Sequence, residues 1–226
     1  DLSIGVVVKK ILVSVGLAFS LLFVGAVGHA QNIVYVAHGE DFFAPAPHDG
    51  EIGTIDLATG IYTTLATSLG DVQGLASDGT NLYAYSDTTQ LLWQIDPATG
   101  AMSSTPLTGP CANFPLFDMA WNPASGEFYS LMGPYLCGLN VSNGASVVVR
   151  DLETGANKRT IAFGADGTLY MGSPYLDDGL GTFNIATGQF TALLGIQPFR
   201  VLGMDVHPTT GLLIASTDDG CGQFCF

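Results

Sequence analysis

The chain has 226 residues, of which 47% are hydrophobic and 12% charged, with 29 glycines and 11 prolines. This hydrophobic share supports a packed core, and the frequent glycine and proline favour many short strands joined by turns. The formal net charge of −14 argues against nucleic acid and anionic membrane surfaces as partners, because an acidic surface repels phosphate. A divalent cation, or a cationic or neutral ligand, fits this charge better.

The N-terminal region has the pattern of a signal peptide. Two lysines precede an uncharged run from Ile11 to Val27, and Gly28 and Ala30 then supply the small residues that a signal peptidase prefers. We therefore expect a signal peptide over residues 1–30, cleaved after Ala30, and a mature domain over residues 31–226. An uncleaved membrane anchor is the alternative, since the run is near the lower limit for spanning.

The chain has no Met at its first position, and Val8 stands directly before two lysines. This context favours translation from a start codon read at Val8. The start assigned to the gene would then lie too far upstream, and residues 1–7 would not be part of the protein.

The mature chain begins with an incomplete β repeat. Residues 32–37 (NIVYVA) have the composition of a strand, and residues 38–50 (HGEDFFAPAPHDG) form a long loop. Residues 53–66 (GTIDLATGIYTTLA) then supply two strands joined by a turn. We expect this first repeat to lack an inner strand.

The next repeat, residues 72–107, shows the complete unit. Its four apolar or β-rich segments (VQGLA, NLYAYS, LLWQID and AMSSTPL) are separated by turns such as DGT and PATG. A third repeat runs from Phe117 to about Arg150 and a fourth from Lys158 to Leu194. A fifth begins at Arg200 and has two strands, VLGMDV and LLIAS.

Two landmarks recur about every 40–45 residues, which is the period of a four-stranded propeller blade. One is the Asp or Asn that opens a turn, and the other is an apolar residue of the first strand: Asp56, Asp96, Asn140 and Asn184, and Leu75, Met119, Ile161 and Met204. The sequence therefore predicts an all-β fold, a β-propeller of four-stranded antiparallel blades with about four to five repeats. Its incomplete ends favour a fragment of a larger ring with two exposed edges.

The loops are expected to divide between two faces. Short turns rich in Asp, Asn and Gly join strands one to two and strands three to four, so Asp56, Asp78, Asp96 and Asp166 are interpreted as turn formers. Longer and more varied loops gather on the opposite, long-loop face, where binding residues usually lie. The candidate ligand-binding residues there are His38, Asp41, Phe42, His48, Tyr135, Tyr175, Asp177 and Asp178.

A metal site is a possible use of these acids. Asp118 at an inner strand and the Asp218-Asp219 pair offer the carboxylates that Ca²⁺ prefers, although their spacing matches no metal motif, and a solvated loop is the alternative. No G-x-S-x-G segment or Ser/His/Asp set predicts nucleophilic catalysis. We therefore assign no catalytic residues and no cofactor, with Ca²⁺ left open.

The four cysteines, Cys111, Cys137, Cys221 and Cys225, suit an exported protein. Both Cys111 and Cys137 are expected on the long-loop side of the third repeat. We choose the pairs Cys111–Cys137 and Cys221–Cys225 among three connectivities. A redox or metal role for the closely spaced second pair is the alternative.

Four segments resemble the repeats of secreted bacterial β-propellers of the quinoprotein-like and YVTN/NHL-like group, including uncharacterised exported domains. They are GEIGTIDLATGIYTTL, GLASDGTNLYA, QLLWQIDPATGAM and MAWNPASGEFYSL. The resemblance covers nearly all of residues 32–217 and implies the propeller fold. Quinoprotein repeats carry a Trp shortly after the TG, where this chain has Ile61, Met102 and Phe190, so the resemblance does not extend to pyrroloquinoline quinone binding. Lactonase-like propellers hold a central Ca²⁺, for which Asp118 is the one matching candidate.

Two classes of function remain open. The first is an exported binding or scaffold module, secreted, periplasmic or at the cell surface, that contacts a protein, a carbohydrate or a small molecule through the long loops. It would bind no nucleic acid and would not stay in the membrane after signal cleavage. The second is a lactonase-like, Ca²⁺-dependent hydrolase or lyase with its site at the mouth of the channel.

Overall fold

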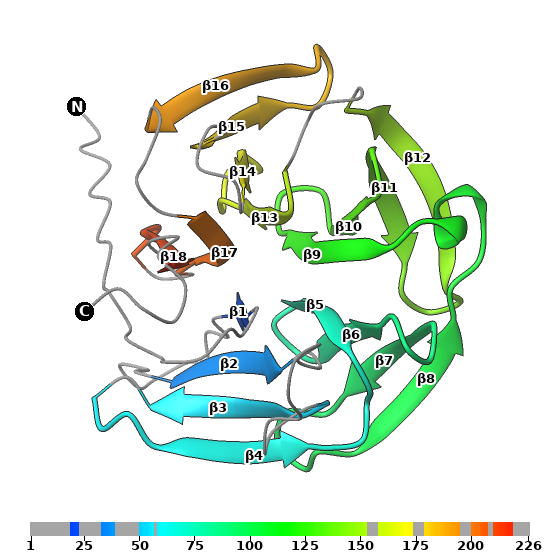
Figure 1. Cartoon of the computed structure of the whole chain (residues 1–226), viewed down its shortest axis with the longest axis vertical. Coiled ribbons are helices and arrows are strands. Elements are labelled where there is room, and N and C mark those ends of the chain that lie inside the picture. Colours follow the sequence, from blue (N-terminus) through cyan, green and yellow to red (C-terminus); the bar gives the residue numbers. More distant parts are fainter. Residues whose placement is uncertain are drawn as a thin grey trace.

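The chain folds into a β-propeller, seen along its axis in the computed structural model (Figure 1). The residues that the structure describes are 19–22, 33–38, 50–56, 58–152, 158–173, 179–194, 200–207 and 210–218. Within these residues, four antiparallel four-stranded sheets and one two-stranded sheet surround a central axis. The predicted all-β blade architecture is confirmed.

Blades 1 and 2 each run from an inner to an outer strand in chain order. Blade 1 consists of β1 (Phe19–Leu22), β2 (Ile33–His38), β3 (Ile52–Asp56) and β4 (Tyr62–Ala66). Blade 2 consists of β5 (Val72–Ser77), β6 (Leu82–Ser86), β7 (Leu91–Ile95) and β8 (Met102–Pro106).

The same order holds in the following blades. Blade 3 follows a short 3-10 helix, η1 (Pro110–Asn113), and consists of β9 (Leu116–Asn122), β10 (Glu127–Met132), β11 (Tyr135–Asn140) and β12 (Ala145–Asp151). Blade 4 consists of β13 (Thr160–Phe163), β14 (Leu169–Gly172), β15 (Leu180–Asn184) and β16 (Gln189–Leu194). Blade 5 has β17 (Arg200–Val206) and β18 (Leu213–Asp218).

Blade 1 has an inner strand that the sequence analysis did not expect. β1 pairs antiparallel with β2, from Phe19 opposite His38 to Leu22 opposite Tyr35. The prediction missed it because the segment lies within the uncharged run that resembles a signal peptide. Cleavage of that peptide stays a prediction.

The first and last blades pack against each other. β17 lies against β13 of blade 4 and also against β1 of blade 1, and Ile214 of β18 packs with the buried Val34 and Val36 of β2. The ring of described blades is therefore closed, which differs from the expected arrangement of two separate exposed edges.

Apolar side chains between neighbouring blades form the core. At the seam between blades 2 and 3, the rings of Tyr83 and Phe128 meet edge to face with centroids 4.7 Å apart, and Met119 is fully buried. Opposite Met119, β5 has Gly74, which leaves room for the larger side chains. At this seam a small residue on one blade therefore faces large residues on the next.

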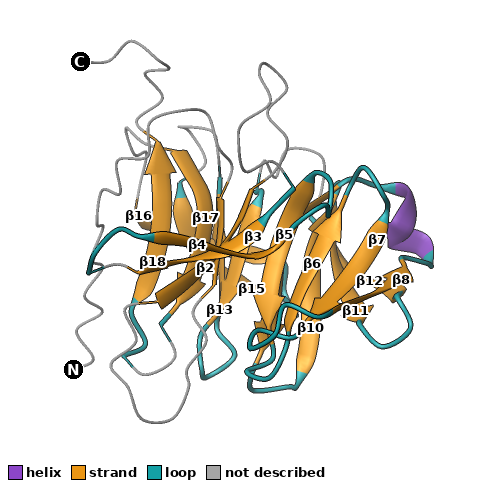
Figure 2. Cartoon of the chain, turned by 90° about the horizontal axis from the view of Figure 1, so that it is seen from below, coloured by secondary structure: helices purple, strands orange, loops and turns teal. Residues whose placement is uncertain are grey.

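The short turns form as the sequence predicts, and Figure 2 shows them together at one face of the ring, with η1 near the other. Asp78 accepts hydrogen bonds from the backbone N–H groups of Thr80 and Asn81, both at 2.8 Å. Asp96 accepts one from the N–H of Ala98, also at 2.8 Å, and this bond lowers the pKa of the carboxyl. The turn acids therefore stabilise the scaffold.

We expect Gly74→Ala to lower the free energy of unfolding by roughly 1–3 kcal/mol, because overpacking a tight core is destabilising. The new Cβ would lie 2.8 Å from Leu116 Cδ2 and 3.0 Å from Met119 Cγ. Gly138→Ala in β11 is the control, since its Cβ would meet only the Val147 and Val149 methyl groups at 3.4 Å. Urea unfolding checks the prediction, and equal effects of the two substitutions would contradict it.

Candidate functional site

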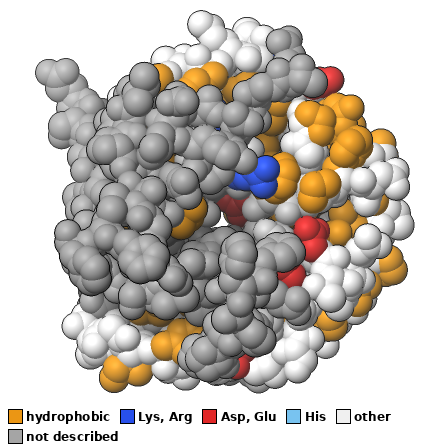
Figure 3. All heavy atoms as spheres, viewed as in Figure 1, with side chains coloured by type: hydrophobic (Ala, Val, Ile, Leu, Met, Phe, Trp, Pro, Cys, Tyr) orange, Lys and Arg blue, Asp and Glu red, His pale blue; other side chains and the backbone are white. Residues whose placement is uncertain are grey.

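The central opening of the long-loop face gathers charged side chains of both signs. Figure 3 views this face and shows acidic and basic groups beside the opening. Asp71 and Arg159 each stand directly before an inner strand, β5 and β13 respectively, and Asp87 lies in the loop that follows β6. All three therefore lie on the long-loop face, and we call this central opening, together with these three residues, the channel mouth.

The acidic side of the channel mouth is held by hydrogen bonds. The N–H of Asp87 donates to the Asp71 carbonyl at 2.9 Å, and Gln73 Nε2 donates to Asp71 Oδ2 at 2.7 Å. The N–H of Asp71 donates to Thr88 Oγ1 at 3.2 Å. Partial burial and the nearby Asp71 carboxylate raise the pKa of Asp87, and a hydrogen bond from the Leu116 backbone lowers it. Hydrogen bonds therefore hold both carboxyls, with Gln73 at Asp71 and the Leu116 backbone at Asp87.

The basic side is built on aromatic rings. The guanidinium carbon of the exposed Arg159 lies 4.1 Å from the centroid of the Phe117 ring. The preceding Lys158 is buried, and its Nζ lies 4.1 Å from the centroid of the Phe190 ring. Cation–π contacts of this kind fix long side chains that would otherwise be mobile.

Asp118 joins blades 3 and 4 close to this basic side. Its Oδ2 accepts hydrogen bonds from Thr160 Oγ1 and the Ile161 N–H, both at 2.9 Å, and its Oδ1 accepts one from the Met119 N–H at 2.9 Å. Burial raises the pKa of this carboxyl to about 7; the three hydrogen bonds lower it, and the charge of Asp205 in β17 raises it. The Asp118 carboxyl therefore links β9 of blade 3 to β13 of blade 4 through hydrogen bonds.

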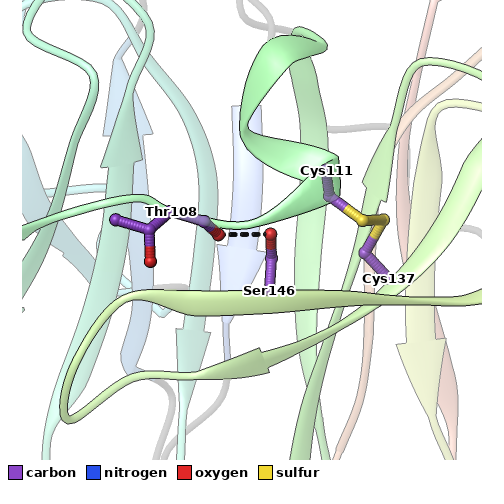
Figure 4. Close-up of a disulfide and its surroundings, with 4 residues drawn as sticks. All are labelled: Thr108, Cys111, Cys137 and Ser146. Atoms are coloured by element: carbon purple, nitrogen blue, oxygen red, sulfur yellow. Dashed lines mark hydrogen bonds between the residues drawn. A yellow bond between two sulfur atoms is a disulfide. The ribbon is translucent and has the colours of Figure 1, made fainter.

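A disulfide fixes the loop that leads into blade 3. Cys111 in η1 is bonded to Cys137 in β11, and both residues are fully buried (Figure 4). Close by, Ser146 in β12 donates a hydrogen bond from its hydroxyl to the Thr108 carbonyl at 2.6 Å. The predicted Cys111–Cys137 pair is confirmed, whereas Cys221 and Cys225 lie outside the described residues.

The candidate ligand-binding residues are only partly within the described chain. Tyr135 starts β11, and its ring meets that of Phe114 edge to face with centroids 5.0 Å apart, so it lies beside the disulfide loop. His38 ends β2 and Asp218 ends β18, where only the backbone is described. The residues outside the described ranges are Asp41, Phe42, His48, Tyr175, Asp177, Asp178 and Asp219.

The sequence analysis missed Asp71, Asp87 and Arg159. Candidates were sought in the long loops, whereas Asp71 and Arg159 directly precede strands and Asp87 lies in the short loop between β6 and β7. The sequence signal that could have found Asp71 and Arg159 is a charged residue directly before the first strand of a repeat.

Among the described residues, no set of three or more His, Cys, Asp or Glu side chains is arranged to hold a metal ion. All three donors to Asp118 come from protein groups, so its oxygens have partners without a metal. Calcium binding through Asp118, Asp218 and Asp219 stays a prediction. Over the same described ranges, no helix has the length and apolar character needed to cross a membrane.

Comparison with known proteins supports the fold and no more. No protein-family model and no curated protein matches the chain. A chain in the crystal structure of a nidogen/laminin complex has a TM-score of 0.57 and 14% identity, covering 83% of this chain and 67% of that one. A glutaminyl cyclase from Myxococcus xanthus has a TM-score of 0.62 and 17% identity, covering 90% and 87%.

A third solved structure, a protein of unknown function from Bacteroides thetaiotaomicron, has a TM-score of 0.57 and 13% identity. The match covers 82% of this chain and 53% of that one, so the chain spans about half its length. At these identities the likeness shows a β-propeller, and propellers of this architecture serve different functions.

Replacing both Cys111 and Cys137 by Ala should lower the free energy of unfolding by about 3 kcal/mol, because the bond closes a loop with a sequence separation of 26. Chemical denaturation with and without a reductant checks this. The reduced wild-type protein should resemble the variant. Equal stability of the variant and the oxidised wild-type protein would contradict the prediction.

Asp118 should also make stability depend on pH. Its folded pKa, about 7, lies above the ordinary value for Asp of about 3.9, so folding takes up a proton between these pH values. This contribution to the free energy of unfolding is present below about pH 4 and is lost as the pH rises through about 7. Wild-type protein should therefore lose stability relative to Asp118→Asn between pH 5 and pH 8.

Urea unfolding of both proteins at the two pH values measures this difference. Asp166→Asn is the control, because Asp166 lies in an exposed turn and hydrogen bonds from Thr168 lower its pKa. A difference between wild type and Asp118→Asn that is the same at both pH values would show that Asp118 titrates normally.

Proposed function

We propose that this chain is an exported β-propeller that binds a ligand at the channel mouth of its long-loop face, as a binding or scaffold module without catalytic activity of its own. The observation that carries the proposal is the neighbouring pair Asp71 and Asp87, held by hydrogen bonds on the same face of the ring as Arg159. Charged groups that are held in place before a ligand arrives lose little conformational entropy on binding.

The rim favours a ligand that carries a positive charge. The two carboxyls are close enough that Asp71 raises the pKa of Asp87, so an ammonium group or a divalent cation would relieve their repulsion. On the same face, the Arg159 guanidinium offers hydrogen-bond donors suited to an anionic or carbonyl group. A cationic or zwitterionic small molecule, or a protein segment with these groups, fits this pattern.

Export is part of the proposal and has two supports. The uncharged run from Ile11 to Val27, with two lysines before it and small residues after it, has the pattern of a signal peptide. The buried disulfide between Cys111 and Cys137 is typical of proteins that fold in an oxidising compartment. With the resemblance of the repeats, these features favour a secreted bacterial propeller of the YVTN/NHL-like group.

Calorimetric titration of the full chain with spermidine and, separately, with calcium chloride tests the proposal. We expect at least one probe to bind wild-type protein and to bind Asp71→Asn/Asp87→Asn about tenfold more weakly, which corresponds to about 1.4 kcal/mol. Asp96→Asn is the matched control, since it removes an acid from a turn on the opposite face. Absence of binding by both probes, or an equal loss in the control, would refute the proposal.

A Ca²⁺-dependent hydrolase or lyase is the second candidate. The observation that favours it is the pair of inner-strand acids, Asp118 and Asp205, whose charges act on each other. The same titration separates the two candidates. Calcium binding that persists in Asp71→Asn/Asp87→Asn but is lost in Asp118→Asn would place the calcium site at Asp118 and not at the channel mouth, which favours the enzyme.

A further inference from the structure

β1 differs from the other inner strands in how it is joined to its blade. Residues 78–81 connect β5 to β6, and residues 123–126 connect β9 to β10, whereas residues 23–32 separate β1 from β2. The sequence predicts a signal-peptidase site in this last stretch, after Ala30. A single cut there would separate β1 from the rest of its blade.

The surroundings of β1 are held by contacts that do not depend on it. Its partner β2 is paired along its other edge with β3, from Ile33 opposite Asp56 to Ala37 opposite Ile52. The buried Val34 and Val36 of β2 pack with Ile214 of blade 5. On the other side, Ala37 packs in the cluster that contains Leu75 and Leu82 of blade 2.

We propose that the slot bounded by β2, β5 and β17 is a strand-acceptor site, which holds Phe19–Leu22 without a covalent link to β2. The segment then stays in the ring after the chain is cut between β1 and β2. This property is independent of ligand binding at the channel mouth.

The chemistry of the slot determines its occupant. Main-chain hydrogen bonds between antiparallel strands provide attraction with little dependence on sequence, as in other cases of strand addition. β1 lies between β5 and β17, in contact with both, so an occupant without charges is favoured. Phe19–Leu22 (FSLL) meets both requirements, since it is extended and uncharged.

A cut in the folded full chain tests the proposal. A recognition sequence for a specific protease is inserted within residues 23–32, and the purified protein is cleaved. Size-exclusion chromatography with mass spectrometry then measures whether the N-terminal fragment co-elutes with the ring. We expect the fragment to stay bound under native conditions and to separate in denaturant.

Two variants make the test specific to β1. Ser20→Pro/Leu21→Pro places prolines at neighbouring positions, so at least one removes an N–H that faces β2, and the bound fraction should fall at least tenfold. Leu12→Pro/Val13→Pro is the control, with two prolines in the same uncharged run outside β1, and it should retain the fragment. Retention in all three proteins would show non-specific adhesion and overturn the proposal.

Hydrogen exchange of the β2 amides (Ile33–His38) gives a readout that does not need the proline variant to fold. In the cleaved wild-type protein, these amides should keep the protection of the uncut chain. Release of the fragment with loss of this protection overturns the proposal. So does release with formation of dimers, which would show that a second copy fills the slot instead.

Discussion

The fit between neighbouring blades is the constraint on which the rest of the structure depends. Buried apolar side chains fill the seams between neighbouring blades, and at the seam between blades 2 and 3 a small residue faces large ones. Gly74 shows how narrow the tolerance is, since a single added methyl group would meet Leu116 and Met119. The packing of blade 3 against blade 4 likewise brings Asp118 of β9 within hydrogen-bonding distance of β13.

Closure of the ring brings the ends of several blades to one face, where the channel mouth lies. Asp71 and Asp87 flank the β5–β6 hairpin of blade 2, and Arg159 stands directly before β13 of blade 4, so the fold places all three on the same face of the ring. Thr88 accepts a hydrogen bond from the Asp71 backbone N–H, Gln73 donates one to the Asp71 carboxyl, and the Arg159 side chain lies over the Phe117 ring. A propeller therefore presents fixed charges at its mouth without needing flexible loops to bring them there.

Local pattern in the sequence predicted much of the fold and little of the site. The repeat period, the turn role of Asp78 and Asp96, and the Cys111–Cys137 bond follow from residues that lie within one repeat or beside it. β1 was missed because a buried strand and a signal-peptide core have the same apolar composition. The grouping of Asp71 with Asp87 was missed because it depends on the pairing of β5 with β6. The position of Arg159 was missed because it depends on where blade 4 lies around the axis.

The most direct test of this account is a double-mutant cycle across the seam that closes the ring, between Val36 of β2 and Ile214 of β18. Unfolding free energies are measured for wild type, Val36→Ala, Ile214→Ala and the double variant. Because the two side chains share one buried cluster, the account predicts a coupling energy between about 0.5 and 3 kcal/mol. Additive effects, within about 0.5 kcal/mol, would mean that blades 1 and 5 do not touch, and that the ring and its mouth are not formed as described.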